Sequence, residues 1–408
     1  MTDAVEEFRG LLRTSLPSEW VAAVEAGNHE RVDELATGTA AAQALATVAG
    51  GGWLTPDWPA EYGGRGLRSD EATAVRRELH RWRVGSVRSA IGAAWVGPTI
   101  LKYGSPELKE LLLPPIARNE ALWCQLFSEP DAGSDLAAVR SRAARTEDAW
   151  TVSGTKTWTS RADTAAFGLA VVRTDPKVPK HAGLTCFCID MAWPGVSINP
   201  IKQMTGDSEF FETVLDAVTV PDTMRLGEPG QGWEVVRTVL SFERAAGSGV
   251  GAAPPGSVVG RSIDELIEHW HGRLDPLDAD RVVEMWLEGR VIEMNNRRTA
   301  LERAAGVSSV AASTPFNKVL QAEHTKRLQQ LFVDLDGVAA LAYDADHEWL
   351  DPNIWAMLRV QAKTIAGGTS EVLRNQIAER ALGLPRDSDP SKTMPWDEFT
   401  RLSRRGSA

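Results

Sequence analysis

The chain has 408 residues, 43% hydrophobic and 24% charged, which is typical of a globular protein with two or three domains. Its 55 acidic residues outnumber its 44 basic ones, and the net charge of −11 argues against nucleic-acid binding, which requires a basic face. No apolar run approaches the length of a membrane span, and the acidic N-terminus lacks a signal-peptide pattern, so we expect a cytoplasmic protein that does not bind membranes.

The residue pattern changes twice along the chain. Residues 1–120 have a mostly helical pattern that glycine and proline clusters interrupt. Residues 121–235 hold short apolar runs separated by turn residues, which predicts a compact antiparallel β-domain. Residues 236–408 return to a pattern of long helices. We therefore expect an α+β multidomain fold with an N-terminal helical domain, a middle β-domain and a C-terminal helical bundle.

Individual elements can be predicted within these three segments. Helices are expected at residues 71–79, 328–341 and 370–382, and strands at residues 167–172, 184–189 and 214–220. The tail that follows Pro385 is expected to be loosely ordered, as chain ends often are.

Two motifs in the predicted β-domain indicate a ligand site. Residues 125–135 (QLFSEPDAGSD) predict a strand that ends in a turn rich in small hydroxyls and N–H groups, which can approach a pyrophosphate closely. Residues 154–160 (GTKTWTS) predict an extended segment in which Trp158 and Ser160 share a face and can line one wall of a planar ligand. Neither motif is specific alone, but their succession is a strong joint signal.

Together with three further segments, these motifs resemble the acyl-CoA dehydrogenase family over most of the chain. The further segments are residues 58–66, 227–233 and 366–374. The resemblance implies bound FAD, a CoA thioester substrate and oxidation of a saturated acyl chain to the trans-2-enoyl form. It also implies that the electrons pass to an electron-transfer flavoprotein.

The resemblance assigns one group of flavin contacts to the first motif. Ser128 would hydrogen-bond the pyrimidine end of the flavin, and Gln125 and Phe127 would line the approach to it. Gly133 belongs to the turn in which Ser134 would contact a phosphate. The alternative for a lone serine at a strand end is a capped turn.

The resemblance assigns a second group of contacts to residues farther along the chain. Trp158 would flank the flavin ring, and Ser160 would approach its N5 atom. Thr369 and Glu371 would touch the cofactor from the C-terminal domain. The alternative for a lone tryptophan is a place in the core.

The catalytic base departs from the usual pattern of the family. The glutamate that usually precedes the Gly-Thr-Ser of the closing segment is replaced here by Gly367, which has no side chain. Some members of the family carry the base on a neighbouring helix, immediately before an arginine, and Glu243 precedes Arg244 at that point. Glu243 is therefore the candidate base, and the N–H of Gly367 could still hold the thioester carbonyl. The alternative is a surface glutamate paired with Arg244.

Small residues follow Glu243 at positions 245–249. A glycine within a helix is unfavourable, so Gly247 suggests room for a bulky acyl group, such as a branched or polycyclic one. Close packing of helices, or the end of the helix, is the alternative explanation.

A second departure concerns assembly. In homotetrameric members, a neighbouring subunit completes the FAD site with Arg-x-x-Phe-Gly and Gln-x-x-Gly-Gly-x-Gly segments, and neither occurs here. Residues 334–340 (DLDGVAA) place acid where a phosphate would approach, which is unfavourable. The chain is therefore similar to a branch, known from bacterial steroid side-chain degradation, that forms heterotetramers of two different subunits. A second dehydrogenase-like subunit is the expected partner, with a homo-oligomer as the alternative.

The sequence also leaves other function classes open. The chain could be a non-catalytic partner subunit of such a heteromer, or a flavin oxidase or monooxygenase on the same fold. His269 and His271 would point about 200° apart on a helix, which argues against a metal site. Cys186 and Cys188 are too close in sequence for an easy disulfide and are interpreted as buried apolar side chains.

Overall fold

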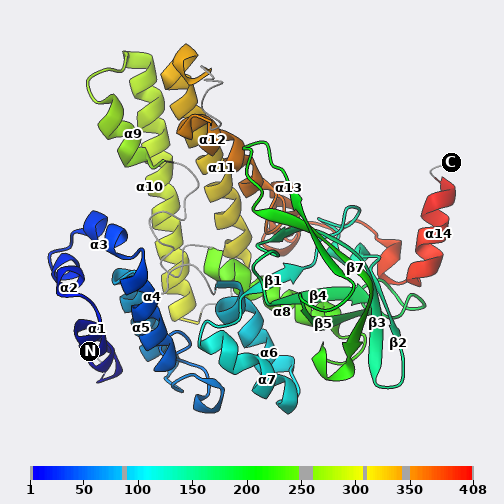
Figure 1. The fold of residues 1–408 in the computed structure, drawn as a ribbon. Coiled ribbons are helices and arrows are strands. Elements are labelled where there is room, and N and C mark those ends of the chain that lie inside the picture. The colour runs from blue at the N-terminus through cyan, green and yellow to red at the C-terminus, as the bar shows by residue number, and fades with distance from the viewer. Residues whose placement is uncertain (1–2, 85–89, 248–260, 307–309, 342–349, 407–408) are drawn as a thin grey trace. The chain divides into compact units, whose positions relative to one another are not determined.

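The computed structural model describes residues 3–84, 90–247, 261–306, 310–341 and 350–406 (Figure 1). The chain divides into two compact units. The first unit comprises residues 1–201, 209–242 and 389–408, and the second comprises residues 202–208 and 243–388.

The N-terminal part of the first unit is helical, as predicted. Its helices are α1 (Asp3–Ser15), α2 (Ser18–Glu25), α3 (His29–Leu35), α4 (Thr39–Gly50), α5 (Ser69–Arg81), α6 (Gly97–Tyr103) and α7 (Pro106–Ala117). Asp70 and Glu71 in the first turn of α5 and Arg81 in its last turn match the polarity of the helix dipole. The apolar faces of α1, α2, α4 and α5 meet in one cluster, in which the indole N–H of Trp20 donates to the carbonyl of Trp82 at 3.0 Å.

A mainly antiparallel sheet forms the centre of the first unit (Figure 1). Its strands are β1 (Trp123–Leu126), β2 (Arg142–Arg145), β3 (Ala149–Ser160), β4 (Phe167–Arg173), β5 (Leu184–Asp190), β6 (Val196–Ile201), β7 (Phe210–Pro221) and β8 (Arg225–Leu226). The strand order is β6-β7-β3-β2-β4-β5-β8, and β1 pairs with β4 in parallel. The strands predicted at 167–172, 184–189 and 214–220 correspond to β4, β5 and β7.

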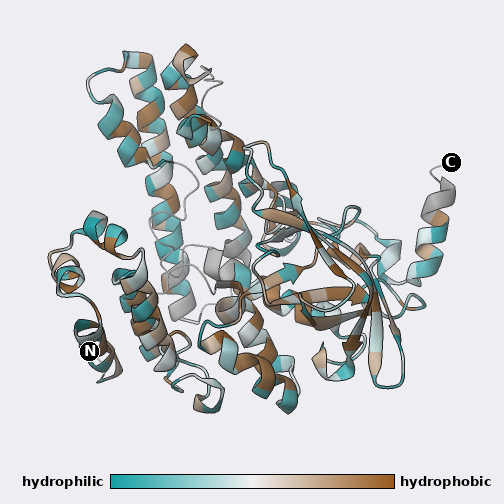
Figure 2. Ribbon diagram, viewed as in Figure 1, coloured by the Kyte–Doolittle hydropathy of each residue, from teal (hydrophilic) through white to brown (hydrophobic). Residues whose placement is uncertain are grey.

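The largest hydrophobic core lies on this sheet. Every residue of β4 except Phe167 and every residue of β5 except Asp190 is buried. Figure 2 shows these strands largely in brown, the colour of hydrophobic residues. Cys186 and Cys188 are fully buried free thiols, which confirms their interpretation as apolar side chains. Burial raises the pKa of the Cys186 thiol to about 12, so this group is unreactive at neutral pH.

The second unit is helical. Its helices are α9 (Ile263–Trp270), α10 (Pro276–Ala304), α11 (Val310–Asp336), α12 (Pro352–Val360) and α13 (Ser370–Arg380), while α8 (Gly232–Gly247) has residues in both units. Leu266, Val282, Leu328 and Phe332 pack together between α9, α10 and α11. The helix predicted at 328–341 ends earlier, at Asp336, because Gly337 adopts a φ of +58° and begins a 3₁₀ turn.

The expectation of a loosely ordered C-terminal tail is wrong. The tail forms α14 (Trp396–Gly406), and the guanidinium of Arg173 lies 4.5 Å from the ring centroid of Trp396, which is buried. The N–H groups of Trp396 and Asp397 also donate to the carbonyls of Val178 and Pro176, each at 3.0 Å. A buried aromatic anchor and backbone pairing thus dock the tail on the β-domain, which the position of the tail at the chain end did not reveal.

Candidate functional site

The fold brings the two sequence motifs together in the first unit. Ser128 follows β1, and its carbonyl accepts a hydrogen bond from the N–H of Thr157 on β3 at 2.9 Å. The strand end that carries Ser128 therefore lies beside the segment that carries Trp158 and Ser160. These neighbours are separated by about thirty residues in sequence, so their proximity results from the sheet topology.

A buried ion pair fastens the two motifs to each other. The ammonium of Lys156 lies 2.8 Å from a carboxylate oxygen of Glu129 and also donates to the carbonyls of Phe127 and Val171, at 3.2 and 2.7 Å. These three acceptors match the three N–H donors of an ammonium, and the Glu129 charge opposes the burial that lowers the pKa of Lys156. The sequence analysis quoted both residues without assigning them a role.

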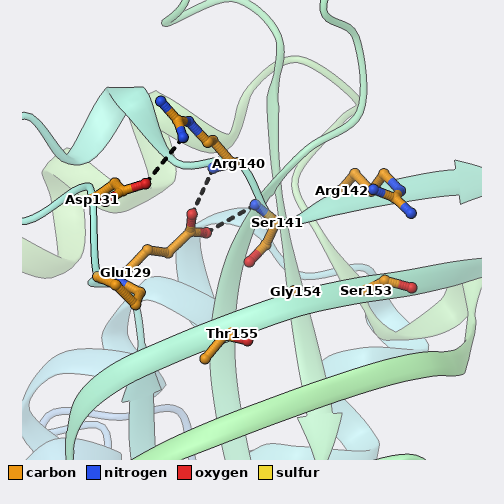
Figure 3. A pocket seen from close by; sticks show the side chains of 9 residues that line it. Glu129, Asp131, Arg140, Ser141, Arg142, Ser153, Gly154 and Thr155 are labelled. Atoms are coloured by element: carbon orange, nitrogen blue, oxygen red, sulfur yellow. Dashed lines mark hydrogen bonds and ion pairs between the residues drawn. The ribbon is translucent and has the colours of Figure 1, made fainter.

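The second half of this network holds a neighbouring turn. The Glu129 carboxylate accepts the backbone N–H groups of Arg140 at 2.6 Å and Ser141 at 3.0 Å (Figure 3). Burial alone would raise the pKa of Glu129, but the charge of Lys156 and these hydrogen bonds outweigh it and keep that pKa below its ordinary value. The Glu of the first motif and the Lys of the second thus have a structural role.

The glycine of the second motif has a structural role as well. A Cβ on Gly154 would lie 2.0 Å from the Ser141 hydroxyl and 2.6 Å from the Ser141 Cα, so only glycine fits where β3 crosses this chain segment. Gly154 and Ser141 line an open pocket together with Glu129 and Arg140 (Figure 3). The residues that line this pocket do not include those predicted to bind flavin.

Trp158 differs from these residues because its side chain is 58% exposed. It has a φ of +59°, in the left-handed region, and lies in an irregularity of the β3–β7 pairing between Lys156 and Thr159. The indole meets the Phe210 ring edge to face, with ring centroids 6.0 Å apart. A strained backbone that presents a large apolar side chain to solvent is typical of a ligand-binding position, and the core alternative for Trp158 is wrong.

The remaining predicted flavin residues of the first unit occupy two environments. Gln125 is half-buried on β1, and its side-chain Nε2 is buried without a hydrogen-bond partner among the described residues. Phe127 is buried, and Ser128 and Ser160 are half-buried. Gly133 and Ser134 lie on an exposed turn, where a Cβ on Gly133 would meet open space. The unpartnered donor of Gln125 and the exposed Trp158 suit a planar ligand with acceptor atoms, so these residues fit a flavin.

We expect replacement of Trp158 by Ala to reduce the amount of flavin that copurifies with the protein while leaving the thermal stability of the apoprotein nearly unchanged. The side chain is mostly exposed, so little buried surface is lost. The matched control is Trp150→Ala on the same strand. Trp150 is buried and donates to Asp222 at 2.7 Å, so this change costs about 3–5 kcal/mol of stability. Equal losses of melting temperature in the two apoproteins would contradict the assignment of Trp158.

The second unit places the candidate base beside Gly367. Gly367 has a φ of +67°, and a Cβ built on it would lie 3.4 Å from a carboxylate oxygen of Glu243. The Glu243 carboxylate therefore reaches the place where a side chain at position 367 would begin. Sequence reasoning named both residues, and their contact brings residues 124 positions apart together.

Thr369 and Glu371 lie at the start of α13. Thr369 is the N-cap of the helix, and its hydroxyl accepts the N–H of Val372 at 3.1 Å. Glu371 is exposed and lies 3.7 Å from Arg374 in an ion pair along the helix. The structure therefore gives Thr369 a capping role, in addition to which its O–H can still act as a donor.

The acidic segment at 334–340 is engaged inside the second unit. Asp334 at the end of α11 forms an ion pair with Arg281 of α10. Asp336 accepts a hydrogen bond from the side-chain amide of Asn353 at 2.6 Å. Of the small residues at 245–249, Ser248 and Gly249 lie outside the described residues, as do the side chains of the other three.

Comparison with known proteins identifies the family. The sequence matches three family models, described as the acyl-CoA dehydrogenase N-terminal domain at residues 10–120, middle domain at 124–218 and C-terminal domain at 230–382. The chain is 34% identical over 398 residues to acyl-CoA dehydrogenase IpdE1 of Mycobacterium tuberculosis, covering 94% of this chain and 99% of IpdE1. The chain belongs to the acyl-CoA dehydrogenase family, a family of flavoprotein oxidoreductases that typically bind FAD.

Two further comparisons are more specific. Acyl-CoA dehydrogenase FadE34 of Mycobacterium tuberculosis is 38% identical over 336 residues, which make up 82% of this chain but only 45% of FadE34. The chain thus spans less than half the length of that relative. Among solved structures, the Tcur3481-Tcur3483 steroid ACAD is similar with a TM-score of 0.72 and 26% identity, covering 94% of this chain and 97% of that chain.

Two further features concern the part of the chain that the structure describes. Its helices include none that combines the length and apolarity needed to span a membrane. Its histidine, cysteine and acidic side chains do not gather in groups of three or more that could hold a metal ion.

Proposed function

We propose that this chain is an FAD-dependent acyl-CoA dehydrogenase subunit in which Glu243 is the catalytic base. The observation that carries the proposal is the 3.4 Å between a Glu243 carboxylate oxygen and the Cβ position of residue 367. Residue 367 is where the resemblance places the usual base, and the Glu243 carboxylate lies within van der Waals reach of the Cβ that such a side chain would have. The base has therefore moved from the closing segment to α8 while its carboxylate serves the same location.

Two groups of the second unit divide the chemistry in this proposal. The carboxylate of Glu243 removes the proton from the carbon next to the thioester carbonyl. The N–H of Gly367 donates to the carbonyl oxygen, on which negative charge develops as the proton leaves. Flavin, held by the residues assigned to it below, would supply the acceptor for the hydride of the β-carbon, so that the product is the trans-2-enoyl thioester. The electrons then pass to an electron-transfer flavoprotein.

The proposed flavin contacts within the two motifs are the residues that have no structural role in the sheet. Lys156, Glu129 and Gly154 hold the sheet together, whereas Trp158 remains exposed and Gln125 retains an unpartnered donor. We assign flavin binding to a set that also includes Phe127, Ser128, Gly133, Ser134, Ser160, Thr369 and Glu371. Phosphate binding belongs to the exposed turn of Ser134.

We also propose that the chain works with a second, different subunit of the family and acts on a bulky or steroid side-chain thioester. The similar solved structure is described as the Tcur3481-Tcur3483 steroid ACAD, a name that joins two proteins. In this chain Arg281 forms an ion pair with Asp334, and this carboxylate competes with a phosphate of a neighbouring flavin for the guanidinium. A chain that cannot complete a neighbour's cofactor site in this way requires a different partner to do so.

Anaerobic reduction of the flavin by a panel of acyl-CoA thioesters tests this function. The chain is purified alone and after co-expression with candidate dehydrogenase-like partners, and flavin absorbance is followed after straight-chain, branched and steroid thioesters are added. We expect bleaching in the complex. Absence of bleaching with every thioester in a complex that retains FAD would contradict the proposal and favour a non-catalytic subunit, and peroxide release in air would indicate an oxidase.

A further inference from the structure

The turn at Gly367 and Gly368 has an external support that the sequence analysis did not include. The side-chain ammonium of Lys318 on α11 donates to the carbonyl of Gly368 at 2.7 Å. Lys318 is half-buried, one position after the buried Asn317. The hydrogen bond joins two segments fifty residues apart.

This turn needs such a support because of its composition. Gly367 and Gly368 both have left-handed φ angles, of +67° and +98°. Consecutive glycines populate many backbone conformations, and they offer no side chains through which neighbours could fix one of them. Backbone bonds secure the flanks, since Ala366 donates to Ala362 at 2.8 Å and Thr369 caps α13. Among the described residues, Lys318 is the side chain that binds the turn between those flanks.

We propose that Lys318 is a positioning residue that fixes the Gly367–Gly368 turn against the carboxylate of Glu243. The inference rests on the proposed function, in which the Gly367 N–H and the Glu243 carboxylate act on the same thioester. A donor and a base that must work together require a fixed separation, and a shift of about 1 Å can cost about 100-fold in rate. Lys318 supplies this fixation by tethering the carbonyl that follows Gly367.

The charge of Lys318 gives it a second effect on the same carboxylate. Burial lowers the pKa of Lys318, and the charged groups that act on it are Glu323 on α11, Lys363 in the turn at 361–364, Glu371 on α13 and Glu243 on α8. Arg359 on α12 acts in turn on Lys363. Glu323 is held 3.3 Å from Arg374, and Glu371 lies 3.7 Å from the same arginine, so both acids share another cation. The Lys318 charge therefore favours the ionised form of Glu243, in which Glu243 acts as a base.

The test compares Lys318→Met with Lys318→Arg and with Lys326→Met, a lysine about two turns farther along α11. Hydrogen exchange of the amides at 365–373 is measured on the assembled, FAD-loaded protein, and the rate of flavin reduction by an acyl-CoA is measured against pH. We expect faster exchange in Lys318→Met, slower reduction of the flavin, and a midpoint of the acidic limb that moves to higher pH. Lys318→Arg should keep all three properties close to those of the wild type, and Lys326→Met should change none of them.

Two outcomes separate this proposal from the proposed function. If Glu243→Gln abolishes flavin reduction but Lys318→Met matches Lys326→Met in exchange and in pH midpoint, the positioning role is wrong and the base assignment stands. If the flavin of Glu243→Gln is reduced by an acyl-CoA at the normal rate, the proposed function is wrong and the positioning role is wrong with it. Should Lys318→Met not fold, Lys318→Gln keeps a donor without the charge. An unchanged pH midpoint in that variant, with exchange also unchanged, overturns the proposal.

Discussion

Replacement of Glu243 by Gln will slow reduction of the flavin by an acyl-CoA thioester by about 10²–10⁴-fold or more, the usual contribution of a general base. Gln keeps the shape of the side chain but cannot accept the proton. FAD content and thermal stability should stay close to those of the wild type, because Gln has nearly the same size and shape as Glu. Stopped-flow absorbance under anaerobic conditions measures the rate.

Glu234 provides the matched control on the same helix. It is exposed and accepts a hydrogen bond from the Tyr103 hydroxyl at 3.2 Å. The flavin of Glu234→Gln should be reduced by the thioester at the wild-type rate. Glu234 lies nine positions before Glu243 on α8, too far along the helix to act at the same place. Equal rates for Glu243→Gln and the wild type would move the base to another chain of the assembly.

Moving the base back to position 367 gives a stricter test of the same idea. In a Glu243→Gln background, Gly367→Glu would restore a carboxylate to the usual position in the family. The φ of +67° makes this change cost about 1–2 kcal/mol, so we expect only partial recovery of the rate. No recovery, in a variant that still folds and binds FAD, would show that position 367 does not point at the reacting carbon.

The sequence was sufficient to propose Glu243 as a candidate base and Gly367 as its companion because the evidence for both was local. Gly367 lacks a side chain, and Glu243 precedes an arginine, so both could be read from short motifs. Their contact, by contrast, depends on α8 and on the turn before α13 meeting in space, which no periodicity encodes. Lys318 was missed for the same reason, because its partner is a backbone carbonyl that leaves no sequence signature.

The two flavin motifs show a different limit of sequence reasoning. The motif residues Glu129, Lys156 and Gly154 hold strands together. Trp158, by contrast, has an exposed side chain that a ligand could contact. A motif therefore mixes residues that build a site with residues that line it. Burial separates the two groups, and burial follows from the sheet register and not from the spacing of letters. The tail illustrates the same point, because the burial of its anchor Trp396 could not be inferred from its place at the chain end.

Breaking the buried ion pair is expected to have the largest effect on stability. Glu129→Gln leaves the fully buried ammonium of Lys156 without its counter-charge, which costs about 3–5 kcal/mol. The double variant Glu129→Gln/Lys156→Met removes both charges and should recover much of this loss. Urea unfolding, followed by tryptophan fluorescence and by hydrogen exchange of β3, measures the changes. Additive losses in the double variant would contradict the pairing.

The contribution of Glu129 should also depend on pH in a defined direction. Since the pKa of this carboxyl in the folded protein lies below its ordinary value of 4.5, its stabilising effect is complete above that value and is lost as the pH falls through the folded pKa. The difference in unfolding free energy between wild type and Glu129→Gln should therefore be constant at neutral pH and shrink below pH 4.5. A difference that grew on acidification would mean that burial, and not Lys156, governs the pKa of this carboxyl.

Because Lys156 also binds the carbonyl of Phe127, next to Ser128, loss of the pair should lower FAD retention in step with stability.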